Sequence, residues 1–246
     1  MTFKAAVILF ELGVVGTALP ALAEDLTKKP AQVTVTTTEH VNFAPGGMIR
    51  IEESIGYVNV EGWDQPEVEI TLTKSMPFDY KPPEDVTKHL DSVKIVAERK
   101  SDNELVVSTD LPKRRSLSSP FSPHRNGDSV RVEYEIHAPR DSKLVINHGV
   151  GSVFVKDIEG DIDVSGGRGD IMLMLRDSGS YAIDAKSKFG TVISDFDGAT
   201  KLSRYRLGER YATTDSQSSR RIHLRMGFGG ITINAIPPEA FSAASK

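Results

Sequence analysis

A chain of 246 residues with 39% hydrophobic residues is long enough to bury a substantial core, in one large domain or two small ones. Its formal net charge of -4 argues against a dedicated nucleic-acid binder, which would normally carry a strongly basic domain, so we expect no nucleic-acid partner. The absence of cysteine excludes disulfides, thiolate metal sites and a cysteine nucleophile.

The first segment, residues 1–23, has the layout of a cleavable signal peptide. Lys4 precedes an apolar run from Ala5 to Leu19, and the small-residue site Ala21-Leu22-Ala23 follows it. The run is too short and wrongly flanked for a stable membrane span. Glu11 makes it less hydrophobic, so an uncleaved membrane anchor is the alternative. We expect an exported protein of the periplasm, the outer envelope or the cell surface, with no membrane span after cleavage.

After a flexible segment at 24–32, the region 33–148 has the pattern of a β meander. Short stretches alternate apolar and polar residues, and turn-forming residues separate them. These stretches are MIRIEES from Met48, YVNVEG from Tyr57, EVEITLTK from Glu67, VKIVAERK from Val93, ELVVSTD from Glu104 and SVRVEYEIHA from Ser129. Two loops interrupt the meander, at 76–92 and 112–128, and Pro82-Pro83-Glu84-Asp85 in the first is typical of the start of a short helix.

Regular glycine spacing marks the region 149–234. The glycines that set the period are 18 or 21 residues apart: Gly151, Gly169, Gly190, Gly208 and Gly229. Two strands of about five residues plus two turns take about 20 residues, so each interval fits one coil of a β-solenoid with glycine at its corners. The predicted fold class is therefore all-β, with an N-terminal β meander that continues into a short-coil β-solenoid of 18–21 residues per coil.

Alternation within the coils predicts which side chains form the core. Apolar residues at every second position share one face of each strand. They are Val153, Val155, Ile162, Val164, Ile171, Leu173, Leu175, Val192, Ile222, Leu224, Ile231 and Ile233. Stacked coils bury such residues as a continuous column, so we expect 33–234 to form a single β domain, followed by a disordered tail at 235–246.

Asp161, Asp163 and Asp170, which follow Asp157 and Glu159, are the candidate catalytic carboxylates. Paired carboxylates can cleave polysaccharides, and parallel β-helices include many carbohydrate-active enzymes. Asp161 and Asp163 alternate with apolar residues, however, as outward residues of a half-buried strand do. We therefore predict no catalytic residue and no enzyme. The alternative is a polysaccharide-acting β-helix enzyme that uses Asp161, Asp163 or Asp170.

The run Gly166-Gly167-Arg168-Gly169-Asp170 is similar to the calcium-binding nonapeptide of repeat toxins, and it contains the Arg-Gly-Asp tripeptide that some adhesion receptors bind. Its aspartate comes one residue early for the calcium motif, which also needs tandem copies. Gly-Asp-Ile recurs from Gly160, so the repeat itself explains the tripeptide. The six histidines show no metal-ligand spacing. We predict no metal site and no cofactor.

Basic clusters indicate a partner of opposite charge. They are Lys113-Arg114-Arg115, Arg204 and Arg206 with Arg210 and Tyr211, and Arg220-Arg221 with Arg225. The second cluster interleaves aromatic residues, which is typical of an anion-binding or glycan-binding surface. We expect an envelope or surface protein or an anionic polymer as the partner, and charged outward positions without a ligand are the alternative.

Met172 and Met174 make the segment from Ile171 to Leu175 apolar on both faces. Since the three residues that alternate with them point to the core, the methionines point outward. A loop around Met76-Pro77-Phe78 would cover them in one interpretation. In the other, they form a surface for a partner or for self-association.

Three segments carry a resemblance to a known family: Asn42–Thr71, Gly151–Ile171 and His223–Asn234. They contain a Pro-Gly-Gly turn, the sequence GYVNVEGWD and Gly-Asp-Ile coils, and in these features the chain from about 33 to 234 resembles the bacterial putative-adhesin family, domain of unknown function 4097. The chain departs from that pattern in its inserts at Met76 and Pro112 and in the weak coil after Gly208. The resemblance implies an exported β-solenoid with an adhesin-like role, and it supplies no catalytic residue.

Together these features predict a non-enzymatic, extracytoplasmic β-solenoid. Its expected role is adhesin-like or envelope-associated, as a binding or structural protein.

Overall fold

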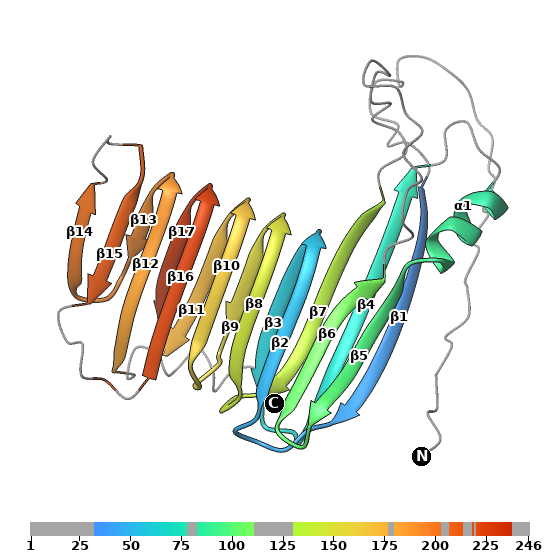
Figure 1. The fold of residues 1–246 in the computed structure, drawn as a ribbon, viewed down its shortest axis with the longest axis horizontal. Coiled ribbons are helices and arrows are strands. Elements are labelled where there is room, and N and C mark those ends of the chain that lie inside the picture. Colours follow the sequence, from blue (N-terminus) through green and yellow to red (C-terminus); the bar gives the residue numbers. More distant parts are fainter. Residues whose placement is uncertain are drawn as a thin grey trace, which may run out of the picture.

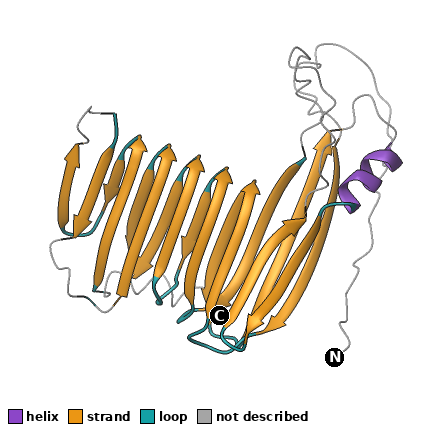
Figure 2. Ribbon diagram, viewed as in Figure 1, coloured by secondary structure: helices purple, strands orange, loops and turns teal. Residues whose placement is uncertain are grey.

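The computed structural model describes residues 32–77, 83–110, 130–176, 180–202, 207–213, 218 and 220–237. Strands account for most of these residues, which confirms the all-β prediction (Figure 2). Within these ranges there is one helix, α1 (Pro83–Asp91), at the position that its proline-rich start predicts. No helix in the described ranges is long and apolar enough to cross a membrane. The predicted signal at 1–23 and the predicted loop at 112–128 lie outside the described residues.

The strands form two mixed sheets that face each other across one core (Figure 1). Sheet A has eight strands, in the spatial order β1 (Gln32–Asn42), β4 (Glu67–Pro77), β7 (Arg131–Pro139), β3 (Tyr57–Trp63), β9 (Val153–Lys156), β11 (Ile171–Arg176), β17 (Ile231–Ile236) and β13 (Val192–Ser194). Sheet B has nine strands, in the spatial order β14 (Gly198–Leu202), β15 (Glu209–Thr213), β12 (Tyr181–Phe189), β16 (Arg220–Phe228), β10 (Ile162–Arg168), β8 (Lys143–Val150), β2 (Met48–Ile55), β6 (Glu104–Asp110) and β5 (Lys94–Ser101).

The middle of the molecule is built from β-arches, in which the chain leaves a strand of sheet B, turns and enters a strand of sheet A. The arches are β2/β3, β8/β9, β10/β11, β12/β13 and β16/β17, and neighbouring arches pair in parallel. Their spatial order departs from the sequence order, because β16/β17 lies between β10/β11 and β12/β13. Since β15 pairs with one edge of β12, β16 occupies the other edge. The coils therefore do not stack in the order that a simple solenoid predicts.

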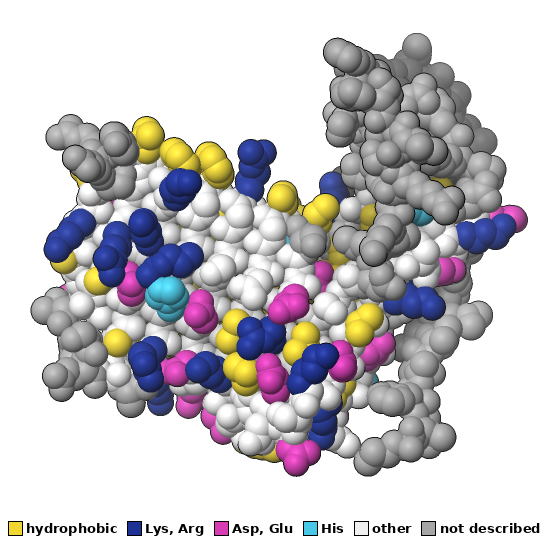
Figure 3. All heavy atoms as spheres, in the orientation of Figure 1, with side chains coloured by type: hydrophobic (Ala, Val, Ile, Leu, Met, Phe, Trp, Pro, Cys, Tyr) yellow, Lys and Arg dark blue, Asp and Glu magenta, His cyan; other side chains and the backbone are white. Residues whose placement is uncertain are grey.

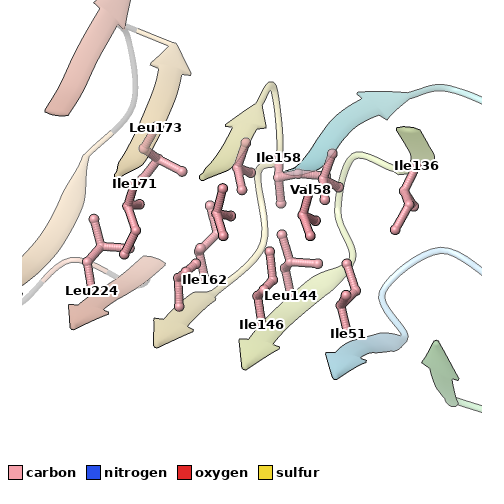
Figure 4. Close-up of a cluster of buried hydrophobic side chains, with 14 of the residues drawn as sticks. Ile51, Val58, Ile136, Leu144, Ile146, Ile158, Ile162, Ile171, Leu173 and Leu224 are labelled. Carbon is pink, nitrogen blue, oxygen red and sulfur yellow. The ribbon is translucent and has the colours of Figure 1, made fainter. Parts of the chain in front are cut away.

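The core lies between the two sheets and follows from the alternation of side chains. Every inward residue predicted for the region 149–234 is buried, and none of them is more than 4% exposed. Figure 4 shows side chains from both sheets, such as Ile162 of β10 and Leu173 of β11, in one continuous cluster. Because both inner faces are apolar, the hydrophobic effect drives the sheets together over the whole length of the stack.

Glycines occupy the corners of the arches. Gly56, Gly151, Gly169, Gly190 and Gly229 have φ values between 129° and 150°, which residues with a Cβ rarely adopt. The corners also stack too closely for a side chain, since a Cβ on Gly151 would overlap the carbonyl oxygen of Gly56. These five glycines form a row along one edge of the molecule, which we call the glycine edge. The prediction of glycine at the coil corners is confirmed for Gly151, Gly169, Gly190 and Gly229. It is wrong for Gly208, which precedes the antiparallel strand β15 instead of turning an arch.

The predicted meander is wrong in its strand pairing. β2 and β3 lie in different sheets, and β2 pairs in parallel with β6 and β8 instead of with its sequence neighbours. Alternation identifies the buried face of a strand but not its neighbours. The strands that do pair as antiparallel neighbours in this half are β1 with β4, β4 with β7, and β5 with β6.

Three predicted boundaries also need correction. The segment 76–92 is not a loop throughout, because β4 continues to Pro77 and α1 begins at Pro83. α1 buries Val86 and Leu90 against Met76 in a small second cluster. The flexible segment at 24–32 is one residue too long, because β1 begins at Gln32. The disordered tail at 235–246 begins too early, because β17 continues to Ile236.

Candidate functional site

The candidate site is an open groove on the outer face of sheet B, beside the glycine edge (Figure 3). It has a volume of about 700 Å³ and crosses β8, β10, β16 and β12. Gly149, Gly167 and Gly227 lie side by side in its floor, and a Cβ on Gly167 would come within 2.5 Å of the carbonyl oxygen of Gly149. Because these positions carry no side chains, the floor is peptide backbone. We call this site the glycine groove.

Two lysines bring positive charge to the β12 end of the glycine groove. Lys186 and Lys188 are exposed, and no carboxylate in the described part of the chain lies within ion-pair distance of either ammonium group. Arg225 differs, because it donates to the Asp184 carboxylate at 2.6 Å and to the Asp184 carbonyl at 2.9 Å. Burial alone would raise the pKa of Asp184, but hydrogen bonds from Arg210 and Arg225 outweigh it and lower the pKa. The two lysines are therefore the cations available to a ligand.

Glu53 lies at the β2 end of the groove and is only 6% exposed. Tyr134 Oη donates to its Oε2 at 2.9 Å, and Thr109 Oγ1 donates to its Oε1 at 3.0 Å. Burial raises the pKa of Glu53 to about 7, and the two hydrogen bonds oppose this rise. Below pH 7 the carboxyl group is therefore mostly protonated, and its hydrogen bond to Tyr134 of sheet A directs it toward the core, not to the outer face.

The remaining groups of the groove are neutral. His148 Nε2 donates to the carbonyl of Gly56 at 3.0 Å, and burial lowers the pKa of the ring, so the histidine is uncharged at pH 7. Asn147 and Ser165 add polar side chains to the lining. In the described ranges, no three His, Asp or Glu residues lie close enough to hold a metal ion. The groove therefore suits an extended ligand that packs on the backbone floor and offers anionic groups to the lysines.

The candidate carboxylates from the sequence lie in three different places. Asp161, at the edge opposite the glycine edge, accepts a hydrogen bond from Arg221 N at 2.9 Å. Asp170, on the glycine edge, accepts one from Gly230 N at 2.8 Å. Asp163 lies on the outer face of sheet B and is about half exposed. None of the three lines the glycine groove. Asp161 and Asp170 thus each bind a backbone amide, Asp163 lies 3.4 Å from His223 Nδ1, and the absence of a catalytic role stays a prediction.

Asp157 and Glu159 belong to an ion-pair network at the edge opposite the glycine edge. Asp157 is 4% exposed, accepts a hydrogen bond from Arg176 Nε at 2.6 Å and also pairs with Arg140. Arg176 reaches Glu159 at 3.0 Å, and Arg140 Nε donates to Asp64 at 2.6 Å. We call these five residues the charged edge. They join the turn before β8 to the turn before β10.

The predicted basic clusters form the site only in part. Lys113–Arg115, Arg204 and Arg206 lie outside the described residues. Arg210 is held in the ion pair with the Asp184 carboxylate, and Tyr211 is buried, with its hydroxyl donating to a backbone carbonyl at 2.7 Å. Tyr211 is therefore not an exposed stacking surface.

The two outward methionines are not covered by the segment that the sequence suggested. Met172 is 39% exposed on the outer face of sheet A, and Met174 is partly buried there. Met76 is instead buried against α1, at the other end of the molecule (Figure 1). Phe78 lies outside the described residues.

Sequence reasoning missed Lys186, Lys188 and Glu53. A usable signal was present, because Gly149, Gly167 and Gly227 each stand two residues before a corner glycine. That repeated Gly-x-Gly pattern places backbone without side chains on adjacent strands. Alternation places Glu53 on the same face as Ile49 and Ile51, but the sequence does not show that Tyr134 and Thr109 from distant strands hold its carboxylate there.

No protein-family model matches the chain, and no curated protein sequence matches it. Among solved structures, the chain is similar to a putative cell adhesion protein from Clostridium sporogenes, with a TM-score of 0.47 and 15% identity over 82% of this chain and 100% of that one. It is also similar to a putative adhesin from Bacteroides fragilis, with a TM-score of 0.31 and 11% identity over 83% of this chain and 99% of that one. The family resemblance stays a prediction.

Proposed function

We propose that this protein is a non-enzymatic, extracytoplasmic binding protein that holds an anionic polymer of the cell envelope or cell surface in the glycine groove. The observation that carries the proposal is a pair of lysines, Lys186 and Lys188, that have no carboxylate partner among the described residues and lie beside a floor of exposed backbone. The predicted signal at 1–23 supports export, and the resemblance to adhesins supports a binding role.

The shape of the site favours an extended ligand. The groove is open and runs across adjacent parallel strands, so a chain molecule can lie along the backbone floor. Lys186 and Lys188 stand two residues apart on β12, a separation of about 7 Å, which suits two charges on successive parts of one polymer. A small neutral metabolite would leave both ammonium groups without a partner.

Calorimetric titration with polygalacturonate, a carboxylate-bearing glycan, tests the proposal, with uncharged dextran as the comparison. We expect binding to polygalacturonate that weakens with salt, because exposed charges are screened. Replacing Lys186 and Lys188 together by Gln should weaken it by about tenfold or more, since charge-assisted hydrogen bonds are the strong ones.

The matched control is the Lys94→Gln, Lys100→Gln variant on β5, which changes the net charge equally at the other end of sheet B. It should bind as the wild type does. Equal weakening in both variants, or equal binding of dextran, would contradict the groove as the site.

A further inference from the structure

A row of exposed side chains, with the half-buried Phe189 among them, follows the glycine edge. At each corner, the residue before the glycine projects from the edge, and these residues come from successive strands of sheet B and the turn that leads into β15. In spatial order they are Ile55, Val150, Arg168, Phe228, Phe189 and Leu207. We call this row the apolar ridge. Figure 3 shows hydrophobic side chains along the same edge, interrupted by a basic one.

The exposure of the ridge contradicts what alternation predicts. Val150 and Phe228 stand two residues after the inward residues His148 and Met226, so they have the position of core residues. Each is nevertheless 49% exposed, because the chain turns at the next glycine and leaves the side chain beyond the core. The fold therefore places apolar side chains in solvent at positions where a polar residue would not weaken the core.

Exposed hydrophobic residues concentrate at this edge. Of the large hydrophobic residues that are exposed in the described ranges, more than half lie on the ridge or directly after its first corner: Ile55, Tyr57, Val150, Leu207 and Phe228. The ridge is one side chain wide, and its five strand spacings give a length of about 24 Å. Such a strip is too narrow for a stable protein interface, which needs about 800 Å² from each partner.

Basic groups accompany the apolar side chains. The Arg168 guanidinium lies 5.7 Å from the centroid of the Phe228 ring, and Lys188 Nζ lies 5.5 Å from the centroid of the Phe189 ring. The two phenylalanine rings stack at 4.5 Å. Long basic side chains next to aromatic rings are typical of protein that sits at a lipid headgroup layer, where the rings enter the apolar zone and the charges meet phosphates.

We propose that the apolar ridge is a membrane-contacting edge, which inserts its apolar tips into the headgroup region of a bilayer that contains anionic lipids. A bilayer accepts a narrow convex strip because lipids move aside, and the charge of Arg168 and Lys188 complements anionic headgroups. The protein then stands on its glycine edge, with the glycine groove close to the surface. This inference goes beyond the polymer-binding proposal, since it rests on the edge and shares only Lys188 with the groove.

A tryptophan placed on the ridge tests the inference in the full chain. Phe228→Trp reports the ridge, Met172→Trp reports the outer face of sheet A as the matched control, and the wild type supplies the background of the single native tryptophan, Trp63. With vesicles of phosphatidylcholine and phosphatidylglycerol, we expect the emission of the ridge tryptophan to shift to shorter wavelength. Phospholipids brominated in the upper acyl chain should quench it, and the control tryptophan should show neither effect. Equal quenching at both positions, or none at position 228, would overturn the inference.

Vesicle co-sedimentation measures the energetic contribution of the ridge. The Phe228→Asp, Leu207→Asp variant should bind vesicles at least about tenfold more weakly than the wild type. Ile193→Asp, at a residue that is 59% exposed on the outer face of sheet A, should bind as the wild type does. All variants keep the same N-terminal segment, so any contribution of this segment to vesicle binding is the same in each of them.

Three further outcomes separate this inference from its alternatives. Unchanged polygalacturonate binding in the Phe228→Asp, Leu207→Asp variant would support separate surfaces for membrane and polymer. A wild-type dimer that becomes a monomer in this variant, without any change in vesicle binding, would assign the ridge to a second copy and overturn the inference. Equal vesicle binding by wild type and ridge variant would also overturn it.

Discussion

Both long edges of the strand stack carry the connections between sheet A and sheet B, but different chemistry holds each edge together. At the glycine edge, every arch turns from sheet B to sheet A through a glycine with positive φ, and the corners stack on one another. At the charged edge, the returning connections differ in length and are joined by ion pairs around Asp157. The glycine edge shows that one backbone conformation, repeated, is enough to build the stack. The charged edge shows that a connection without that repeat needs its own side-chain contacts.

The largest expected effect breaks the glycine edge. Gly229→Ala places a Cβ against the carbonyl of Gly169 at a φ of 132°, so both a backbone collision and an unfavourable conformation oppose folding. We expect a loss of about 4 kcal/mol in the free energy of unfolding, measured by urea denaturation.

Gly46→Ala is the control for conformation alone. Gly46 also has positive φ, 76°, but a Cβ there would meet only a side-chain oxygen at 4.0 Å. A cost of about 1 kcal/mol is expected. If the two substitutions cost the same, close stacking of the corners does not matter for stability.

The charged edge is the next test. Asp157→Ala removes the carboxylate that Arg140 and Arg176 share, and it leaves two partly buried guanidinium groups without this partner. The expected loss is about 2–3 kcal/mol by chemical denaturation, below the value for fully buried pairs because both arginines touch solvent. Asp64→Ala, at a side chain that is 83% exposed, should change stability by less than about 0.5 kcal/mol. A loss for Asp157→Ala as small as for Asp64→Ala would show that the network does not hold this edge.

The regular edge is the part of the fold that the sequence predicts well. Four of the five glycines in the series with intervals of 18 and 21 residues identify corners, with Gly208 as the exception, and alternation identifies the core residues between them, because both signals depend only on local backbone geometry. The position of β16/β17 between earlier arches was not predictable, because each arch has nearly the same pattern. The pairing of β15 with β12, which decides that position, is a long-range contact.

The candidate site also has one part that the sequence predicts and another that only the structure shows. The Gly-x-Gly sequences that form the groove floor are visible in the chain. Lys186 and Lys188 become distinctive only because no carboxylate of the ranges that the structure describes lies within ion-pair distance of them. Exposure at the ridge was also beyond prediction. Val150 follows the alternation of buried residues, and only the position of the turn places it in solvent.

Glu53 sharpens the comparison with the charged edge, because it is a buried carboxyl group close to the glycine edge and no arginine in the described part of the chain pairs with it. Burial raises its pKa from 4.5 to about 7 in the folded protein, so the folded state binds the proton more tightly than the unfolded chain does. The stability of the wild type relative to Glu53→Gln is therefore fully present below pH 4.5 and is lost as the pH rises through 7. The difference in pKa corresponds to at most about 3 kcal/mol.

Thermal and urea unfolding of both proteins between pH 4 and pH 8, a range of about four units around the two pKa values, measures this effect. Glu53→Gln should gain stability relative to the wild type as the pH rises, while the Tyr134 and Thr109 hydroxyls keep an acceptor. A constant difference over the whole range would show that the pKa of Glu53 is the same in the folded and unfolded states, and would contradict the raised pKa.

The smallest effect is expected at Asp163, on the outer face between the two edges. Its side chain is 51% exposed, and its nearest ionisable partner is His223 Nδ1 at 3.4 Å, an exposed pair of the kind that contributes little. Asp163→Asn should therefore change the free energy of unfolding by less than about 0.5 kcal/mol. The same variant tests the enzyme alternative, since an amide cannot act as a general base or a nucleophile. If the wild type releases reducing ends from an envelope glycan and Asp163→Asn or Asp170→Asn abolishes this release, the protein is a polysaccharide-acting enzyme and the binding role is secondary.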